Sequence, residues 1–142
     1  MIIIAYVRVA GMEIKMVLLG DPRTKKNSPR IVGGKYPKLL PSKAFAAYQD
    51  AVGWQIKCRG LRISEPVNIK AVFYMGTRRK VDLANLNSSL HDILVHYEVL
   101  ADDNRDIVAA TDGSRVLYDK AQPRVEVEIT SLADYKQWSK HD

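Results

Sequence analysis

A run of apolar side chains at three- and four-residue steps occupies the middle of the chain. This spacing places them on one side of an α-helix, where they face a hydrophobic core. The apolar stripe consists of Leu83, Leu86, Leu90, Ile93, Leu94 and Tyr97. The sequence therefore predicts a core-facing helix in this stretch, and the other features of the chain are interpreted around it.

A second, polar stripe follows the same steps on a neighbouring face of this helix. It consists of Asp82, Asn85, Ser89, Asp92 and His96. Asp82 stands where a capping carboxylate accepts backbone N–H bonds and meets the positive end of the helix. Asp102 and Asp103 follow the helix, so acidic residues stand at both of its ends.

These acidic residues favour a metal site when they are considered together. Each has a simpler explanation alone, because Asp82 can be only a cap and residues 102–104 can be only a turn. Carboxylates that fold into one pocket repel one another, which implies a cation or a shared proton between them. Hard oxygen ligands suit Mg²⁺ or Mn²⁺.

Length and composition indicate one ordinary globular domain over residues 1–142. The apolar run at residues 1–10 is interrupted by Arg8 and has no basic leader, so it resembles neither a signal peptide nor a membrane span. We therefore expect a cytoplasmic protein with no membrane partner. A single cysteine, Cys58, excludes an intrachain disulfide and a cysteine zinc site.

The charge of the chain favours an anionic partner, with nucleic acid as the first candidate. Lys and Arg number 22 against 16 Asp and Glu, which gives a formal net charge of +6. Seven of the basic residues fall in residues 20–43, where prolines and glycines predict a loop without regular structure. A solvated loop and a phosphate-binding loop explain this segment equally well. Tyr36 adds a surface on which an unpaired base could stack.

A second basic cluster, Arg78, Arg79 and Lys80, lies immediately before Asp82. Phosphodiester chemistry uses such a combination, because cations position the backbone while a carboxylate-held metal activates water. The alternative is mutual neutralisation between this cluster and Asp82.

The remaining segments predict the rest of a single α+β domain with a mixed sheet and two main helices. The second helix begins after Ser42 and runs to about Cys58. Asp112-Gly113 is either a hairpin turn or a bulge in a longer strand whose turn is at residues 118–122. Residues 1–11 are a candidate N-terminal extension, and residues 133–142 form a polar tail. Strands are expected at residues 2–9, 13–19, 67–74, 106–117 and 123–132.

The order of these features resembles the RusA family of Holliday junction resolvases over most of the chain. The resemblance implies an α+β homodimer that requires Mg²⁺ or Mn²⁺ and cuts four-way DNA junctions. It is carried by Gly20-Asp21-Pro22, Lys25-Lys26-Asn27-Ser28-Pro29-Arg30, the helix near Tyr48, Asp82-Leu83-Ala84-Asn85-Leu86 and Asp102-Asp103.

The resemblance also implies roles for individual residues. Asp82, Asp102 and Asp103 are the expected catalytic metal ligands. Of the last two, Asp103 is the stronger candidate for a ligand. Phosphates are expected to contact Lys25, Lys26, Arg30, Arg78, Arg79 and Lys80.

The chain departs from the family pattern D-x-D-N-L-x-K at two positions. Ala84 replaces the second acid and Ser88 replaces the lysine, so no catalytic role passes to either residue. Asp92, Asp106 or Asp112 could supply a replacement ligand.

Three functions follow from this sequence. The first is a metal-dependent endonuclease for branched DNA in recombination and repair. The second is a branched-DNA-binding protein that has lost cleavage together with the two missing residues. The third is a basic scaffold protein that uses an unrelated surface. Cleavage of four-way junctions with and without divalent metal separates the first two.

Overall fold

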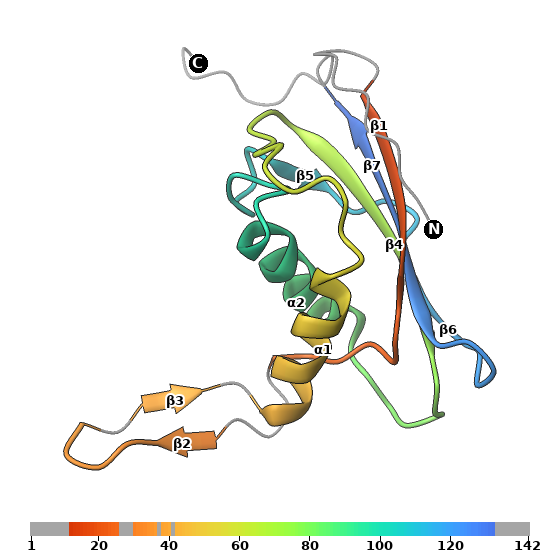
Figure 1. Cartoon of the computed structure of the whole chain (residues 1–142). Helices are drawn as coiled ribbons and strands as arrows, with labels where there is room; N and C mark the ends of the chain where they lie inside the picture. Colours follow the sequence, from red (N-terminus) through yellow and green to blue (C-terminus); the bar gives the residue numbers. More distant parts are fainter. Residues whose placement is uncertain (1–11, 26–29, 37, 41, 133–142) are drawn as a thin grey trace.

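The computed structural model describes residues 12–25, 30–36, 38–40 and 42–132. It has the predicted α+β architecture, with two helices and a mixed sheet of five strands (Figure 1). The elements in chain order are β1 (Glu13–Leu19), β2 (Arg30–Val32), β3 (Lys38–Leu40), α1 (Lys43–Gly53), β4 (Val67–Met75), α2 (Leu83–His96), β5 (Val108–Ala110), β6 (Arg115–Tyr118) and β7 (Arg124–Ser131).

The main sheet has the strand order β1-β7-β4, with β5 and β6 along the outer edge of β4. β7 pairs antiparallel with β1 and with β4, whereas β5 and β6 pair parallel with successive stretches of β4. The crossover from β4 to β5 contains α2, and both helices lie on the same face of the sheet (Figure 1). This layering explains why the apolar stripe of α2 is covered.

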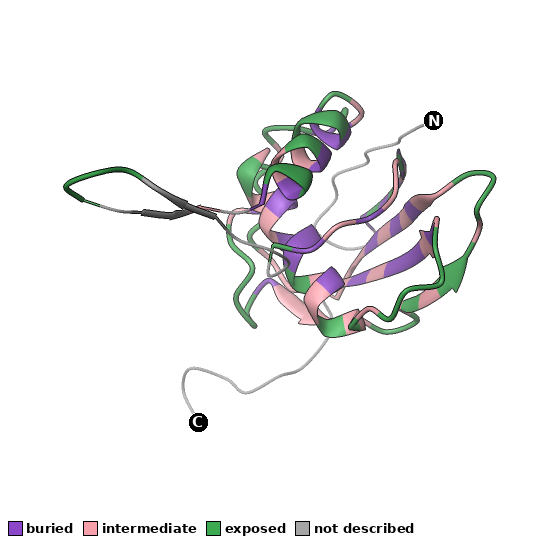
Figure 2. Cartoon of the chain, turned by 90° about the horizontal axis from the view of Figure 1, so that it is seen from below, coloured by how far each residue is buried: buried purple, intermediate pink, exposed green. Residues whose placement is uncertain are grey.

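The core lies between that sheet face and the two helices. Alternate residues of the strands point into it, such as Ile14, Ile69 and Val125, each with no exposed surface. Figure 2 shows this alternation of buried and intermediate residues along the strands. The expected stripe of α2 is confirmed at its centre, because Leu86, Leu90, Ile93 and Leu94 are buried, whereas Leu83 and Tyr97 are partly buried.

The first helix begins where the sequence predicts it and ends earlier. Ser42 is the N-cap, and its hydroxyl accepts the Phe45 N–H at 3.1 Å. The helix was expected to reach Cys58 but ends at Gly53. The side chain of Gln55 explains the early end, because it donates to the Leu19 carbonyl at 3.0 Å and accepts the Leu19 N–H at 2.7 Å. These bonds hold the chain against β1.

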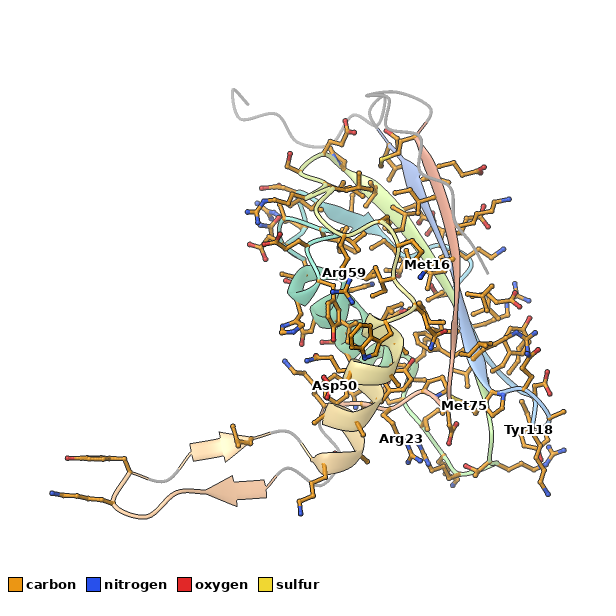
Figure 3. All side chains as sticks on the ribbon, in the orientation of Figure 1. Met16, Arg23, Asp50, Arg59, Met75 and Tyr118 are labelled. Atoms are coloured by element: carbon orange, nitrogen blue, oxygen red, sulfur yellow. The ribbon has the colours of Figure 1, made fainter. Side chains whose placement is uncertain are left out.

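The two helices meet at the end of α1. A Cβ atom at Gly53 would lie 2.3 Å from the ring of Tyr97, so only glycine allows this approach. The Tyr97 hydroxyl donates to the Gln49 carbonyl at 3.0 Å. Arg59, labelled in Figure 3, donates to the Gly53 carbonyl and lies 4.6 Å above the Tyr97 ring. These contacts fix α1 against the end of α2.

Residues 20–43 are more ordered than the sequence predicts. The expectation of a loop without regular structure is wrong, because β2 and β3 form an antiparallel pair within this segment. Proline and glycine residues correctly indicate chain breaks but do not reveal pairing between two strands of three residues.

The two interpretations of Asp112-Gly113 are resolved in favour of an interruption in a longer edge strand. β5 and β6 run in the same direction along β4, so the residues between them form no hairpin. Gly113 adopts a φ of 86°, which accommodates this interruption. The turn into β7 follows Tyr118.

The ends of the domain stay a prediction. The strand expected at residues 2–9, the candidate extension at 1–11 and the tail at 133–142 lie outside the described residues. In the part of the chain that the structure describes, neither helix is long and apolar enough to cross a membrane.

Candidate active site

Asp82 begins α2 as its N-cap. One carboxylate oxygen accepts the Ala84 N–H at 2.9 Å, which confirms the capping role. The residue is exposed and opens onto a pocket of about 380 Å³. This pocket is lined by Thr24, Lys80, Val81, Asp82 and Asn85. Asp82 therefore combines a structural role with access to solvent.

Asp92 and Asp103 meet in a second pocket, of about 510 Å³. Partial desolvation raises the pKa of the Asp103 carboxyl, and the hydrogen bond and the charge of Asp92 raise it further. The two carboxyls therefore lie close enough to hydrogen-bond to each other. The pocket is lined by Lys25, Leu40, Phe45, Ala46, Gln49, Asp92, Val95, His96 and Asp103.

Lys25 attaches the first basic segment to the middle of α2. Its Nζ lies 3.3 Å from Asp92 Oδ2, and its backbone N–H donates to Ser89 Oγ at 2.9 Å. Ser89 is only 3% exposed, so the backbone contact is protected from water. A cation is thus held beside the paired carboxyls. Lys25 and Asp92 are both candidate site residues, but no sequence pattern indicates that they pair.

Asp102 shapes the turn that presents Asp103. Its two carboxylate oxygens accept the Asp103 N–H at 2.7 Å and the Asn104 side-chain amide at 3.2 Å. Asn104 in turn accepts the Asp106 N–H at 2.9 Å. The turn expected at residues 102–104 is therefore present. Within it, Asp103 lines the pocket while Asp102 holds the backbone.

The three expected ligands do not gather at one point in a single copy. Asp92 lies ten positions after Asp82, which is about 15 Å along a helix axis. Among the described residues, no group of three or more His, Cys, Asp or Glu side chains is close enough to hold a metal ion. Joint metal binding by Asp82, Asp102 and Asp103 stays a prediction.

The replacement acids suggested by the sequence occupy different places. Asp92 is the one that adjoins Asp103, and it was visible in the sequence as part of the polar stripe. Asp106 lies in the turn after Asp103, and its backbone N–H bonds to Asn104. Asp112 follows β5, where its backbone N–H donates to the Asn68 side chain at 2.7 Å.

The second basic cluster lies on an exposed loop between β4 and α2. Arg78 stacks on Tyr118, with its guanidinium carbon 4.0 Å from the ring centroid, and Arg79 and Lys80 are exposed. Tyr118 is labelled in Figure 3 at the end of the sheet that carries the β6–β7 turn. Among the ion pairs of the described residues, none joins Arg79 or Lys80 to Asp82, which argues against mutual neutralisation.

The first basic segment, residues 20–43, and the loop that carries the second basic cluster lie side by side where each begins. Asp21, at the start of the first segment, accepts the Gly76 N–H of the second at 2.9 Å. A Cβ atom at Gly76 would lie 2.9 Å from Pro123, so glycine permits this close approach. Arg30 begins β2, and Lys26 lies outside the described residues. The segments that carry Lys25 and Arg78 are therefore held together at their starts by the bond between Asp21 and Gly76.

The family described as endodeoxyribonuclease RusA matches residues 20–130, which include both basic segments, both helices and both acidic positions. The chain belongs to the RusA family. Membership in the RusA family implies Holliday junction resolvase activity in general, together with a general dependence on divalent metal. A search of curated protein sequences found no match.

The carboxylates of the Asp103 pocket are of the kind that binds the divalent metal implied by the RusA family. Asp92 and Asp103 place two carboxylates in one pocket, where the hydrogen bond and the charge of Asp92 raise the pKa of Asp103. Mg²⁺ is commonly held by one or two carboxylates, with water and substrate phosphate as the remaining ligands. The described residues of this pocket therefore fit a hard divalent cation.

Proposed function

We propose that this RusA-family chain is a Mg²⁺- or Mn²⁺-dependent endonuclease that acts in the cytoplasm and cuts four-way DNA junctions as a homodimer. The observation that carries the proposal is the meeting of Asp103 with Asp92 in a pocket whose edge holds Lys25. Carboxylates for a metal and a cation for phosphate are thereby combined in one place.

Asp103 and Asp92 are the proposed metal-holding pair, with Asp102 as the residue that orients Asp103. A bound ion would supply an activated water and would stabilise negative charge on the phosphate oxygens. The chain's own contribution is to hold the two carboxylates together and to keep Lys25 beside them. Asp102 contributes by fixing the backbone of the turn through its bond to the Asp103 N–H.

Asp82 requires a different explanation, because about 15 Å of helix separates it from Asp92 in the same copy. In a homodimer, Asp82 of one copy can approach the Asp103 pocket of the other. A composite site is here one that combines Asp82 of one copy with the Asp103 pocket of the other. A homodimer would have two such sites related by symmetry, and they could cut the paired strands of a four-way junction. This arrangement would bring Asp82 to the pair formed by Asp92 and Asp103, and it is compatible with the absence of a complete ligand cluster among the described residues of one copy.

The proposed phosphate contacts come from Lys25, Lys26, Arg30, Arg78, Arg79 and Lys80. Arg78 is held in place by its stack on Tyr118, so it can contact DNA with little loss of side-chain freedom. The exposed Arg79 and Lys80 lie next to the Asp82 pocket. These cations would direct the DNA backbone past Asp82.

Cleavage of a labelled four-way junction by purified protein, with and without Mg²⁺ or Mn²⁺, tests this function. A linear duplex with the same arm sequence is the matched control. We expect paired cuts in the junction only when metal is present, and no cuts in the duplex. Failure to cut the junction in either metal would contradict the proposed enzyme.

A binding-only protein is the second candidate, and two residues favour it. Ala84 and Ser88 are exposed on the first half of α2 and bring neither carboxylate nor ammonium to the site. This candidate predicts tight junction binding without cleavage in both metals. The cleavage experiment, with junction binding measured in parallel, separates the two candidates.

A further inference from the structure

A two-stranded ribbon, here called the arm, stands apart from the main sheet. It comprises residues 30–36 and 38–40, and its strands β2 and β3 belong to a sheet of their own. Figure 1 shows the arm extending away from the helices and the main sheet. A two-stranded hairpin is only marginally stable in water, so such an arm gains stability when it contacts a partner.

The tip of the arm presents an aromatic ring to solvent. Residues 33–36 are all exposed, and Tyr36 is 76% exposed. The Lys35 ammonium lies 5.9 Å from the centre of the Tyr36 ring. Gly33 adopts a φ of 114°, which allows the chain to turn at this point. The turn therefore displays a flat apolar surface and a positive charge together.

The charge of the surrounding segment indicates the class of partner. No Asp or Glu occurs between residues 22 and 49, whereas seven Lys or Arg residues do. Contact between the arms of two copies would bring two basic segments together, and their like charges would repel. A nucleic acid is attracted by the same charge, and its bases stack on exposed aromatic rings.

We propose that Tyr36 stacks on an unpaired base at the branch point of DNA while Lys35 contacts an adjacent phosphate. Bases inside a continuous duplex are covered by their neighbours, whereas a branch point can expose a base face. Tyr36 is thereby a determinant of the preference for branched over linear DNA. The inference rests on the proposed function for DNA binding alone and does not require cleavage.

The test compares Tyr36→Ala with Tyr36→Trp, which keeps a stacking surface. Trp54→Ala is the matched control, because Trp54 is 81% exposed but follows α1 on the body of the domain. Affinities for a four-way junction and for a linear duplex are measured by fluorescence anisotropy in EDTA, so that cleavage does not interfere. A junction with 2-aminopurine at the branch point reports stacking directly.

We expect Tyr36→Ala to weaken junction binding by about 5- to 150-fold, the range for loss of one stacked base. Duplex binding should change by less than about two-fold, since covered bases offer Tyr36 no surface. Tyr36→Trp and Trp54→Ala should bind both DNAs like the wild type. The wild type, but not Tyr36→Ala, should quench 2-aminopurine.

Equal losses on junction and duplex, or unchanged quenching in Tyr36→Ala, would overturn the inference. So would a shift in sedimentation of Tyr36→Ala without DNA, because it would make the arm a contact between copies of the chain. A wild type that prefers junctions and shows the Tyr36 effect, but never cuts, would contradict the endonuclease and support the stacking. A wild type with no preference for junctions would overturn both.

Discussion

Under the proposed function, a proton and a metal ion compete for the carboxyl oxygens of Asp103. Its pKa is raised by partial desolvation and by Asp92, so the Asp103 carboxyl must lose its proton before it can ligate a cation. Divalent metal binding should therefore strengthen as the pH rises through the titration of Asp103. Asp92 is the residue that makes the pocket a two-carboxylate site.

Asp92→Asn removes one of the two paired carboxylates and keeps the shape of the side chain. We expect junction cleavage to fall by about 10- to 100-fold while junction binding is maintained, because the loss concerns metal affinity. Single-turnover cleavage over a range of Mg²⁺ concentrations measures this effect. Asp112→Asn, beyond β5, is the control and should cut normally. Equal losses in the two variants would refute the role of Asp92.

His91 makes the folding stability of the domain depend on pH. It is 8% exposed, and burial lowers its pKa below the ordinary value of 6.5. Among the described residues, its Nε2 has no hydrogen-bond partner. The unfolded chain therefore binds a proton at a higher pH than the folded chain does. Stability is present above pH 6.5 and is lost as the pH falls through the window between the two pKa values.

His91→Gln should flatten this acid dependence of stability. Urea unfolding at pH 7.5 and at pH 5 measures the free energy of unfolding in each state. The wild type should lose stability between these pH values, and the variant should lose less. His96→Gln removes an exposed imidazole from the same helix and is expected to behave like the wild type. An unchanged pH dependence in His91→Gln would show that another group causes the loss.

At the scale of elements, the contact between α1 and α2 depends on one glycine. Gly53→Ala would ordinarily favour a helix, yet here the added methyl group would lie 2.3 Å from Tyr97. We expect destabilisation by about 1–3 kcal/mol, as in other overpacked cores. Thermal and urea unfolding provide the measurement.

Gly34→Ala is the matched control for Gly53→Ala. A Cβ atom at Gly34 would meet nothing within 4 Å, so this change should alter stability by less than about 0.5 kcal/mol. If Gly53→Ala is as stable as the wild type, the two helices are not packed as closely as the structure shows.

Local patterns were sufficient to predict β1, the start of each helix and the buried stripe of α2. Those features depend on alternation, three- and four-residue spacing and capping residues, all of which are local. The end of α1 depends instead on Gln55 and its bonds to Leu19, 36 residues away in the sequence. The arm depends on pairing between short strands. Such contacts leave no local signal in the sequence.

The candidate site was predictable as a set of residue types but not as an arrangement. The cap at Asp82 and the turn at residues 102–104 follow from local chemistry. The approach of Asp103 to Asp92 depends on how the chain turns back after α2, where Glu98 adopts a φ of 60°. No periodicity in the sequence indicates that turn.

At the scale of the whole molecule, the proposal joins DNA binding, metal binding and dimerisation. The two basic segments are anchored to each other through Asp21 and Gly76, and Lys25 connects one of them to the carboxylate pocket. DNA that contacts these segments would be brought near Asp82 at the start of α2 and near Asp103 in the turn after it. Under this proposal, one copy of the chain would provide two half-sites, and a homodimer would complete two sites.

Mixing Asp82→Asn with Asp103→Asn tests the central claim most directly. Asparagine preserves the helix cap at position 82, so each variant removes only a carboxylate. Single-turnover cleavage of a labelled four-way junction in Mg²⁺ is measured for each variant and for an equimolar mixture that is unfolded and refolded together. We predict that each variant alone binds the junction without cutting it. The mixture should regain about a quarter of the wild-type sites and nick one strand, because half of its dimers hold one intact composite site. Cutting by either variant alone, or a mixture that stays as inactive as its parts, would contradict the account.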